Sequence, residues 1–415
     1  MNYTSRKNRY GLAWFFILIT FVMFNFIPFI GNEVLILASL TVMIFFTMSL
    51  QFGGRIVVQW TIYQTYLVVF VSFIYLSSRW ALRPEYTIGR GNTMLITSLV
   101  MIVISIYCTN VESVDPLLKT AMWGGYIVSI IGILYYGPQN VLSFILEGTR
   151  LTITESFINV NELGMCATYA IIINLYYVFN KQNGWYSLFS IPALMITLAS
   201  GSRKAIAILV LGASALFILK NNEVKNIGKR TLRILGSIVI LLLILYAVTK
   251  LSIFKPIIER VQFVINGVLT GKNSDYSTLT RLNLIAIGQE IFLQHPILGI
   301  GLNNAQFIVE GIYHRSNYYL HNNYIELLAD GGIFGFIIYY WIFIYLLIQL
   351  IKNRSFADLE FDICFVLLVI HLIMDIGNVS FLNRTTYFYL LIYCLELKKR
   401  MIQGKKSNLG EAKIQ

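Results

Sequence analysis

The stretch Ile234-Leu-Gly-Ser-Ile-Val-Ile-Leu-Leu-Leu-Ile-Leu-Tyr-Ala-Val248 contains no charged residue and no alternation of polar and apolar side chains. A continuous apolar block of this kind crosses a bilayer as a helix, because a helix satisfies its own backbone groups in lipid. A membrane β-barrel would instead need segments of about ten residues in which apolar and polar side chains alternate. The stretch therefore predicts a transmembrane helix.

Similar apolar runs recur along the 415 residues of the chain. Hydrophobic residues make up 57% of the sequence and charged residues 13%, whereas soluble domains usually carry about 25% charged residues. We expect an all-α polytopic membrane protein with about twelve transmembrane helices. The expected spans are 11–30, 34–50, 56–76, 93–109, 118–136, 163–180, 185–200, 204–220, 234–250, 333–351, 361–380 and 385–397.

The charge pattern indicates a membrane orientation and argues against a nucleic-acid partner. The net charge is +12, but Lys and Arg lie at the ends of the apolar blocks and cluster in 220–233 and after Lys398. Since basic residues favour the cytoplasmic side, both termini are expected inside a bacterial cytoplasmic (inner) membrane. The expected parts are 1–250 with nine spans, 251–332 as a large folded extracytoplasmic loop that carries the catalytic motifs, 333–397 with three spans, and 398–415 as a basic cytoplasmic tail.

No metal site is predicted. The sequence contains no H-E-x-x-H motif, no D-x-D carboxylate pair and no cluster of Cys and His, which are the usual ligand patterns. The four cysteines lie within apolar runs, where a thiol behaves as a small buried hydrophobic group.

The segment Ser200-Gly-Ser-Arg-Lys204 precedes an apolar run that is expected to lie at the outer face. Ser202 is placed to cap the following helix, which leaves free backbone N–H groups beside Arg203. Free N–H groups and a guanidinium together favour an anion. The alternative is an arginine that reaches from the membrane boundary toward water without a ligand.

The segment Thr278-Leu-Thr-Arg281 begins a second helix, which is expected to start near Thr280 and to stop before Pro296. An arginine in the first turn opposes the helix dipole, and an anionic ligand would relieve that conflict. A solvated surface arginine is the alternative. One side of this helix is expected to be apolar, with Leu282, Ile285, Phe292 and Leu293.

The segment His321-Asn-Asn-Tyr-Ile-Glu326 precedes a third helix. Asn323 is expected to cap it, with Glu326 completing a capping box, and Gly331 or Gly332 is expected to end it before the next span. A neutral imidazole at His321 can act as a general base near pH 7, although a purely structural histidine stays open.

His371 and Asp375 lie one helical turn apart within the span 361–380. A proton relay is one reading of such a pair, and a satisfied buried pair is the other. Asp375 falls near the outer half of its span, where it is within reach of the same outer site.

Four motifs occur in order between residues 155 and 335. They are Asn159–Gly164 (NVNELG), Gly201–Arg203 (GSR), Arg281 followed by His295–Gly301 (HPILGIG), and His321–Glu326 (HNNYIE) followed by Asp330–Gly335 (DGGIFG). As a set, they resemble the O-antigen ligase and O-antigen polymerase (Wzy-type) superfamily of bacterial membrane glycosyltransferases.

The resemblance implies an all-helical fold of the GT-C type, a donor glycan on undecaprenyl pyrophosphate, and no metal or other cofactor. It implies that Arg203 and Arg281 hold the pyrophosphate leaving group and that His321 acts at the acceptor hydroxyl. This agrees with the residues, because two guanidinium groups at helix N-termini can neutralise phosphate charge. The residues expected to contribute to substrate binding are Asn161, Lys204, His314, Arg315, Asn322 and Glu326.

The leading prediction is therefore a polymerase for O-antigen, capsule or exopolysaccharide that transfers a growing glycan, with inversion, onto a lipid-linked repeat unit. A ligase that uses another acceptor is the close alternative, and a lipid-linked glycan transporter is the alternative from another class. The expected partners are the lipid-linked oligosaccharide, the bilayer, and a flippase and chain-length regulator of the same pathway. Because His295, His314 and Arg315 also lie in the outer loop, another choice of base and second cation stays open.

Overall fold

The computed structural model describes residues 11–30, 32–147, 151, 159–180, 184–221, 276–314, 319–353 and 359–411. Within these ranges the chain forms fourteen α-helices, one 3-10 helix and no strand, so the expected all-α architecture is confirmed for the described part of the chain. The elements are α1 (Leu12–Ile30), α2 (Glu33–Gln51), α3 (Ile62–Ser77), α4 (Pro84–Val111), α5 (Asp115–Tyr136), α6 (Pro138–Glu147), α7 (Val160–Phe179), η2 (Gly184–Phe189), α8 (Ser190–Ala199), α9 (Arg203–Asn221), α12 (Tyr276–Gln294), α13 (Ala305–Tyr313), α14 (Asn323–Lys352), α15 (Leu359–Met374) and α16 (Arg384–Glu411).

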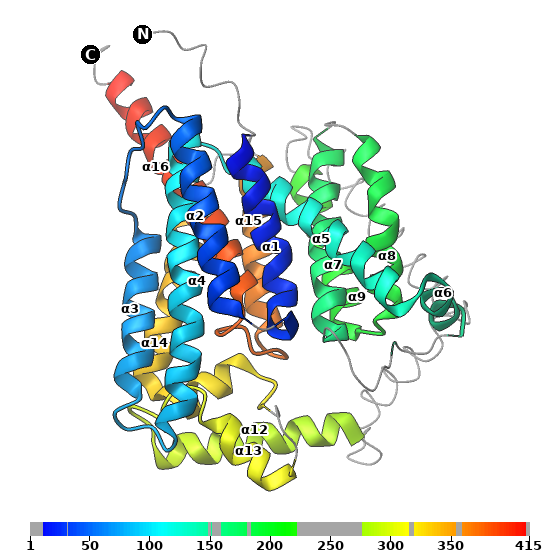
Figure 1. The fold of residues 1–415 in the computed structure, drawn as a ribbon, viewed down its shortest axis with the longest axis vertical. Helices are drawn as coiled ribbons and strands as arrows, with labels where there is room; N and C mark the ends of the chain where they lie inside the picture. The colour runs from blue at the N-terminus through cyan, green and yellow to red at the C-terminus, as the bar shows by residue number, and fades with distance from the viewer. Residues whose placement is uncertain are drawn as a thin grey trace.

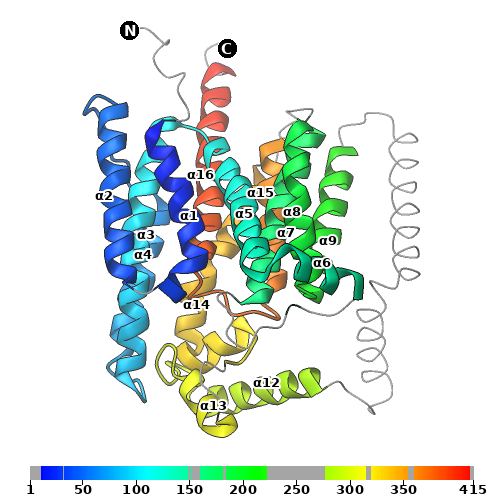
Figure 2. The same ribbon diagram turned by 45° about the vertical axis from the view of Figure 1, so that its right-hand side comes forward.

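The long helices form an upright bundle, and α12 and α13 lie across one end of it (Figures 1 and 2). The start of α1 and the last turns of α16 lie at the opposite end (Figure 1). The two ends of the bundle therefore differ: one carries both ends of the described chain, and the other carries a separate helical layer.

Five described helices are long and apolar enough to cross a membrane: α2, α4, α5, α7 and α14. Four shorter apolar helical stretches accompany them, namely 12–26, 62–77, 184–199 and 361–374. The chain is thus an integral membrane protein with multiple candidate spans. The expected span 204–220 coincides with α9, and the expected span 385–397 is the first part of α16, which continues to Glu411. The expected span 234–250 lies outside the described residues.

Three further expected spans differ from the structure by more than four residues at one end. Residues 56–61 are not helical, so α3 begins at Ile62, and the extended backbone at Val57 exchanges hydrogen bonds with the side chain of Asn110. The helix α15 ends at Met374 rather than at residue 380. The helix α4 begins at Pro84, nine residues before the expected span, because proline is favoured in the first helical turn.

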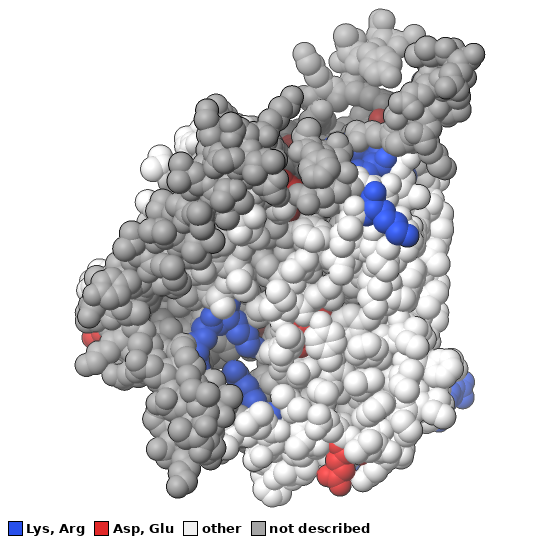
Figure 3. All heavy atoms as spheres, turned by 180° about the vertical axis from the view of Figure 1, so that it is seen from behind, with Lys and Arg blue, Asp and Glu red and all other residues white. Residues whose placement is uncertain are grey.

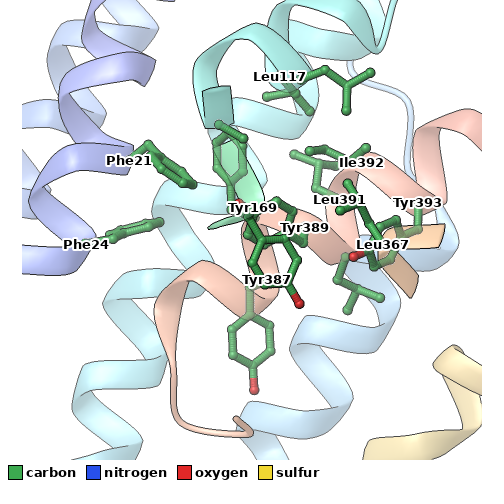
Figure 4. Packing of buried hydrophobic residues seen from close by; sticks show 14 of the residues in the cluster. Phe21, Phe24, Leu117, Tyr169, Leu367, Tyr387, Tyr389, Leu391, Ile392 and Tyr393 are labelled. Atoms are coloured by element: carbon green, nitrogen blue, oxygen red, sulfur yellow. The ribbon is translucent and has the colours of Figure 1, made fainter. Parts of the chain in front are cut away.

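Close helix contacts and aromatic rings make up the core of the bundle. A Cβ at Gly125 of α5 would lie only 2.6 Å from the Cβ of Ala170 of α7, so the two helices need the glycine to pack this closely. Figure 4 shows Phe21 of α1, Tyr169 of α7 and Tyr389 of α16 among the rings that fill the space between these helices. The ring centroids of Tyr169 and Tyr389 lie 4.9 Å apart.

The helix α14 is broken at Gly332, as the sequence predicts. Gly332 has φ 60° and ψ −163°, which is not helical, and a Cβ there would lie 2.3 Å from the carbonyl oxygen of Ile297. Glycine is therefore required both by the backbone angle and by the close approach of the loop after α12. The break separates a short first segment of α14, which carries Asn323 and Glu326, from the long apolar segment that follows.

The loop between α12 and α13 is tied to this first segment by one carboxylate. Asp330 accepts hydrogen bonds from the backbone N–H groups of Asn303 (2.8 Å), Asn304 (3.0 Å) and Ala305 (2.6 Å). Asn304 in turn accepts a hydrogen bond from the backbone of Arg83 before α4. These bonds hold the layer of α12 and α13 against the end of the bundle.

Candidate functional site

The segment that carries His321 is held by the start of α14. Asn322 caps the helix, since its side-chain oxygen accepts a hydrogen bond from Ile325 N at 3.1 Å. The expected cap at Asn323 and its capping box with Glu326 are therefore wrong by one residue. Glu326 instead accepts a hydrogen bond from Leu320 N at 2.9 Å, which fixes the chain immediately before His321.

Asn323 is withdrawn from the capping position by contacts with the end of α15 and the loop that follows. Its side-chain oxygen accepts hydrogen bonds from the backbone N–H groups of Ser380 and Phe381, and its amide donates to the hydroxyl of Tyr340. Its backbone N–H donates to the carbonyl of Asp375. These tertiary contacts decide which of the two neighbouring asparagines becomes the cap.

His321 lies at φ 59°, with its ring centroid 4.0 Å from that of Tyr319. It is half-buried. Burial, and then the positive charges of Arg281 and Lys204, lower the pKa of His321 to about 4. The imidazole is therefore neutral at pH 7, as a general base must be, and it lies within the electrostatic reach of two cations from different helices.

Arg281 comes from α12, which begins at Tyr276. Thr280 is therefore inside the helix, and the expected cap at Thr280 is wrong; the expected end before Pro296 is confirmed. The expected apolar side is not the side that is buried within the described protein, because Leu282 and Leu293 are exposed, whereas Leu284 and Ile291 are buried. The helix is apolar on more than one side, so spacing alone did not identify the side that packs against α14.

Lys204 and Arg203 begin α9. The expected cap is confirmed, since the hydroxyl of Ser202 accepts a hydrogen bond from Ala205 N at 3.4 Å. The charge of Lys204 interacts with those of Arg281 and Glu162, and its side chain reaches Gly377 in the loop between α15 and α16. Arg203 is half-buried in the first helical turn beside it. The structure thus brings Lys204, Arg281 and His321 together, and the roles of these residues and of Arg203 stay predictions.

A cavity of about 210 Å³ lies next to this group. Its wall includes Tyr319 and Glu326 from the His321 segment and Glu162 from the first turn of α7. The ring of Tyr319 lines the cavity and packs against the ring of His321, so the cavity adjoins the His321 segment. On the face seen in Figure 3, Lys and Arg side chains gather on two sides of a hollow in the lower half of the view.

Two arginines reach the same cavity from distant parts of the chain. Arg384 begins α16, is buried, and forms an ion pair with Glu33 at the start of α2. Arg90 lies in the second turn of α4 and is exposed to the cavity. Sequence reasoning missed Glu162, Arg384 and Arg90; Glu162 was within a quoted motif, whereas no quoted motif contained the two arginines.

The other residues predicted to bind substrate lie on different elements and differ in how far they are buried. Asn161 is half-buried in the first turn of α7, which Asn159 caps through a 3.0 Å hydrogen bond to Asn161 N. His314 ends α13 in the left-handed conformation and is exposed. Arg315 lies outside the described residues. The competing base His295 is exposed at the end of α12.

His371 and Asp375 form a buried pair deeper in the bundle. His371 Nε2 lies 3.9 Å from Asp375 Oδ1, and its ring stacks on Phe343. The carboxylate of Asp375 accepts hydrogen bonds from Ser380 Oγ (2.6 Å) and from the hydroxyl of Tyr340 (2.8 Å). Neighbouring side chains thus hold Asp375, whereas Nε2 of His371 is buried without a hydrogen-bond partner among the described residues. Both residues line a cavity of about 70 Å³ that Glu162 also borders. The choice between a buried pair and a proton relay therefore stays open.

Comparison with protein families supports the resemblance read from the motifs. Residues 188–340 match the Wzy_C family, described as O-antigen ligase. The matched stretch contains Arg203, Lys204, Arg281 and His321, and the family implies an enzyme of the glycan ligase or polymerase type. No curated protein matches the chain.

Proposed function

From the O-antigen ligase match over residues 188–340, we propose that the chain is a membrane glycosyltransferase of the GT-C type that works as a polysaccharide polymerase. It transfers a growing glycan from undecaprenyl pyrophosphate onto a lipid-linked repeat unit at the extracytoplasmic face. The observation that carries the proposal is the position of His321: its ring packs against Tyr319 of the cavity wall, and it lies within electrostatic reach of Lys204 and Arg281 from two other segments.

The two cations suit a diphosphate leaving group. When the bond between the anomeric carbon and the diphosphate oxygen breaks, the electron pair and the growing negative charge stay on the diphosphate. Arg281 offers two parallel N–H groups to phosphate oxygens, and Lys204 offers a point charge in the first turn of α9. Cations fixed in place before the reaction stabilise this charge without reorganisation. Arg203, in the same first turn, is the further candidate for this role.

His321 suits the acceptor side of the reaction. The acceptor hydroxyl oxygen forms the new bond to the anomeric carbon from the side opposite the leaving group, which inverts the anomeric centre, and its proton passes to the imidazole. The pKa of about 4 makes free His321 a weak base. A bound diphosphate offsets the charges of Arg281 and Lys204, so the pKa of His321 rises when the donor is in place. Base strength is thereby linked to donor binding.

The test uses purified full-length protein and lipid-linked repeat units in detergent, in the presence of EDTA. We expect polymer to form with the wild type and to be lost in His321→Ala, Arg281→Ala and Lys204→Ala. Arg203→Ala measures the contribution of the neighbouring guanidinium. Arg79→Ala, which removes an exposed arginine from the turn between α3 and α4, is the control.

Three outcomes count against the proposal. Unchanged polymerisation in all of the site variants would remove the site. Transfer of glycan only to an acceptor other than a repeat unit would make the protein a ligase. Movement of the lipid-linked glycan across proteoliposomes, with no new glycosidic bond, would make it a transporter.

A further inference from the structure

The cavity of about 210 Å³ beside the cationic group has a wall rich in side-chain amides. Several of these amides are oriented by a hydrogen bond at one end. Asn25 donates to the carbonyl of Phe21 and Gln306 donates to Glu310, so each directs an oxygen away from that bond. The side-chain oxygens of Asn159 and Asn383 accept hydrogen bonds from Asn161 N and Thr385 N, which leaves their NH₂ groups as donors.

The charged residues of the wall also differ in whether another side chain already occupies them. Arg384 is occupied by Glu33. Arg90 forms no ion pair or hydrogen bond with any residue in the described part of the chain, and it is one of the residues that line the cavity. Glu162, from the first turn of α7, is also accessible from the cavity and interacts with the charge of Lys204. The wall therefore presents fixed donors and fixed acceptors without a single dominant charge.

We infer that this cavity, between Arg90 of α4, Glu162 of α7 and Gln306 of α13, binds a pyranose residue of the acceptor repeat unit. The inference rests on the proposed function and deepens it. Each sugar hydroxyl both donates and accepts a hydrogen bond, so a wall that alternates oriented amide oxygens, amide NH₂ groups, a guanidinium and a carboxylate is complementary to it. Phe24 and Tyr319 add apolar surface for the ring faces.

Size and position agree with this occupant. The volume is below the range of about 300–1,000 Å³ that holds drug-sized ligands, so the cavity suits one sugar ring with the rest of the glycan outside. Tyr319 and Glu162 line the cavity; the ring of Tyr319 packs against that of His321, and the charge of Glu162 interacts with that of Lys204. A hydroxyl at that edge would face the anomeric carbon of a donor bound there.

Other occupants fit less well. An apolar lipid chain would leave the oriented amides without hydrogen-bond partners, which costs free energy for each buried polar group. A diphosphate would meet the carboxylates of Glu162 and Glu326 on the same wall. The cationic group of Lys204 and Arg281 therefore suits the diphosphate of the donor, and the cavity, with its mixed polar wall, suits the acceptor.

The experiment separates acceptor from donor. A lipid diphosphate glycan that is capped at its non-reducing end can only donate, and a repeat unit carried on an alkyl chain, with no diphosphate, can only accept. With this pair, Arg90→Gln and Gln306→Ala are expected to raise the KM for the alkyl-linked acceptor about tenfold, as loss of a hydrogen bond to a charged or oriented group does. The KM for the capped donor is expected to stay unchanged, and Arg79→Gln is the matched control for loss of an exposed guanidinium.

The outcomes separate the two claims. If the wild type transfers glycan but both variants leave the acceptor KM unchanged, or raise only the donor KM, the acceptor site is refuted while the proposed function stands. If the wild type forms no glycosidic bond at all, the proposed function fails. The cavity is then tested by saturation-transfer NMR with the lipid-free repeat unit. A signal in the wild type that is lost in Arg90→Gln supports a sugar site. A wild type that gives no signal refutes one.

Discussion

His321 and His371 are the same residue type in two different regions of the same bundle. His321 lies in a connecting segment beside a cavity, half-buried, with two cations within electrostatic reach. His371 lies inside α15, is 6% exposed, stacks on Phe343, and faces the carboxylate of Asp375. The first histidine is accessible to a substrate and its charge state depends on what binds next to it. The second borders a smaller cavity of about 70 Å³, and it lies in a helix beside a carboxylate that neighbouring side chains hold in place.

The largest expected effect is the loss of activity when His321 is replaced. Its absence would contradict the difference between the two histidines. His321→Ala is expected to lower kcat by about 10²–10⁴-fold, which is the usual contribution of a general base. The measurement is the rate of glycosidic bond formation per folded molecule, with folding checked by size-exclusion chromatography in detergent. His371→Ala is expected to retain near wild-type turnover in the molecules that fold. Equal losses in both variants would show that the two regions do not differ in this way.

Asp375→Ala is expected to lower stability by about 3 kcal/mol or more, because it leaves the partners Ser380 and Tyr340 without their acceptor in a buried place. Thermal unfolding in detergent, followed by the fluorescence of a thiol-reactive dye at the four cysteines, measures the effect. Asp375→Asn keeps the shape and part of the hydrogen bonding, so its loss is expected to be smaller. A wild-type unfolding temperature in Asp375→Ala would contradict the structural role of this pair.

Replacing the neighbouring residues Asn322 and Asn323 is expected to lower stability by smaller and unequal amounts, because only Asn323 makes buried tertiary hydrogen bonds. Asn322→Ala removes a helix cap, which costs about 1 kcal/mol, whereas Asn323→Ala removes buried hydrogen bonds to Ser380, Phe381 and Tyr340 and is expected to cost more than the cap. Unfolding of the two variants in parallel provides the measurement. If Asn322→Ala were the more destabilising of the two, Asn323 would not be the residue that joins α14 to the loop after α15.

Local chemistry in the sequence was sufficient for part of this architecture. Continuous apolar blocks predicted most of the helices, Ser202 was recognised as a cap, and Gly332 was within the pair expected to end a helix. These features depend on a few neighbouring residues. The choice between Asn322 and Asn323 was not predictable, because both can cap and the decision comes from contacts with residues 375–381.

The cavity wall could not be predicted for a related reason. Arg90, Glu162 and Arg384 are far apart in the chain and belong to three different helices, so no motif spacing connects them. The buried side of α12 was also missed, because apolar residues occur around much of that helix, and packing against α13 and α14 selects Leu284 and Ile291. Sequence patterns thus predicted the helices, while the site depends on how these helices pack.

The smallest expected effect is a change in the pKa of His321 when an anion binds, and it tests directly whether the charge state of this histidine depends on what binds beside it. In NMR titrations of protein labelled at histidine, the pKa of His321 is expected near 4 in the free protein and higher in the presence of inorganic diphosphate, because the anion offsets the charges of Arg281 and Lys204. The lowered pKa of His321 also determines how the stability of the folded protein depends on pH. An unfolded histidine titrates near 6.5, so the neutral folded form contributes stability that is present above pH 6.5 and is lost as the pH falls toward 4. His321→Gln, which stays neutral, is expected to lose less stability over that range. In Arg281→Gln the free pKa is expected to rise and the response to diphosphate to shrink. A His321 pKa that diphosphate leaves unchanged would mean that the anion does not bind beside the imidazole, and the link between donor binding and base strength would fail.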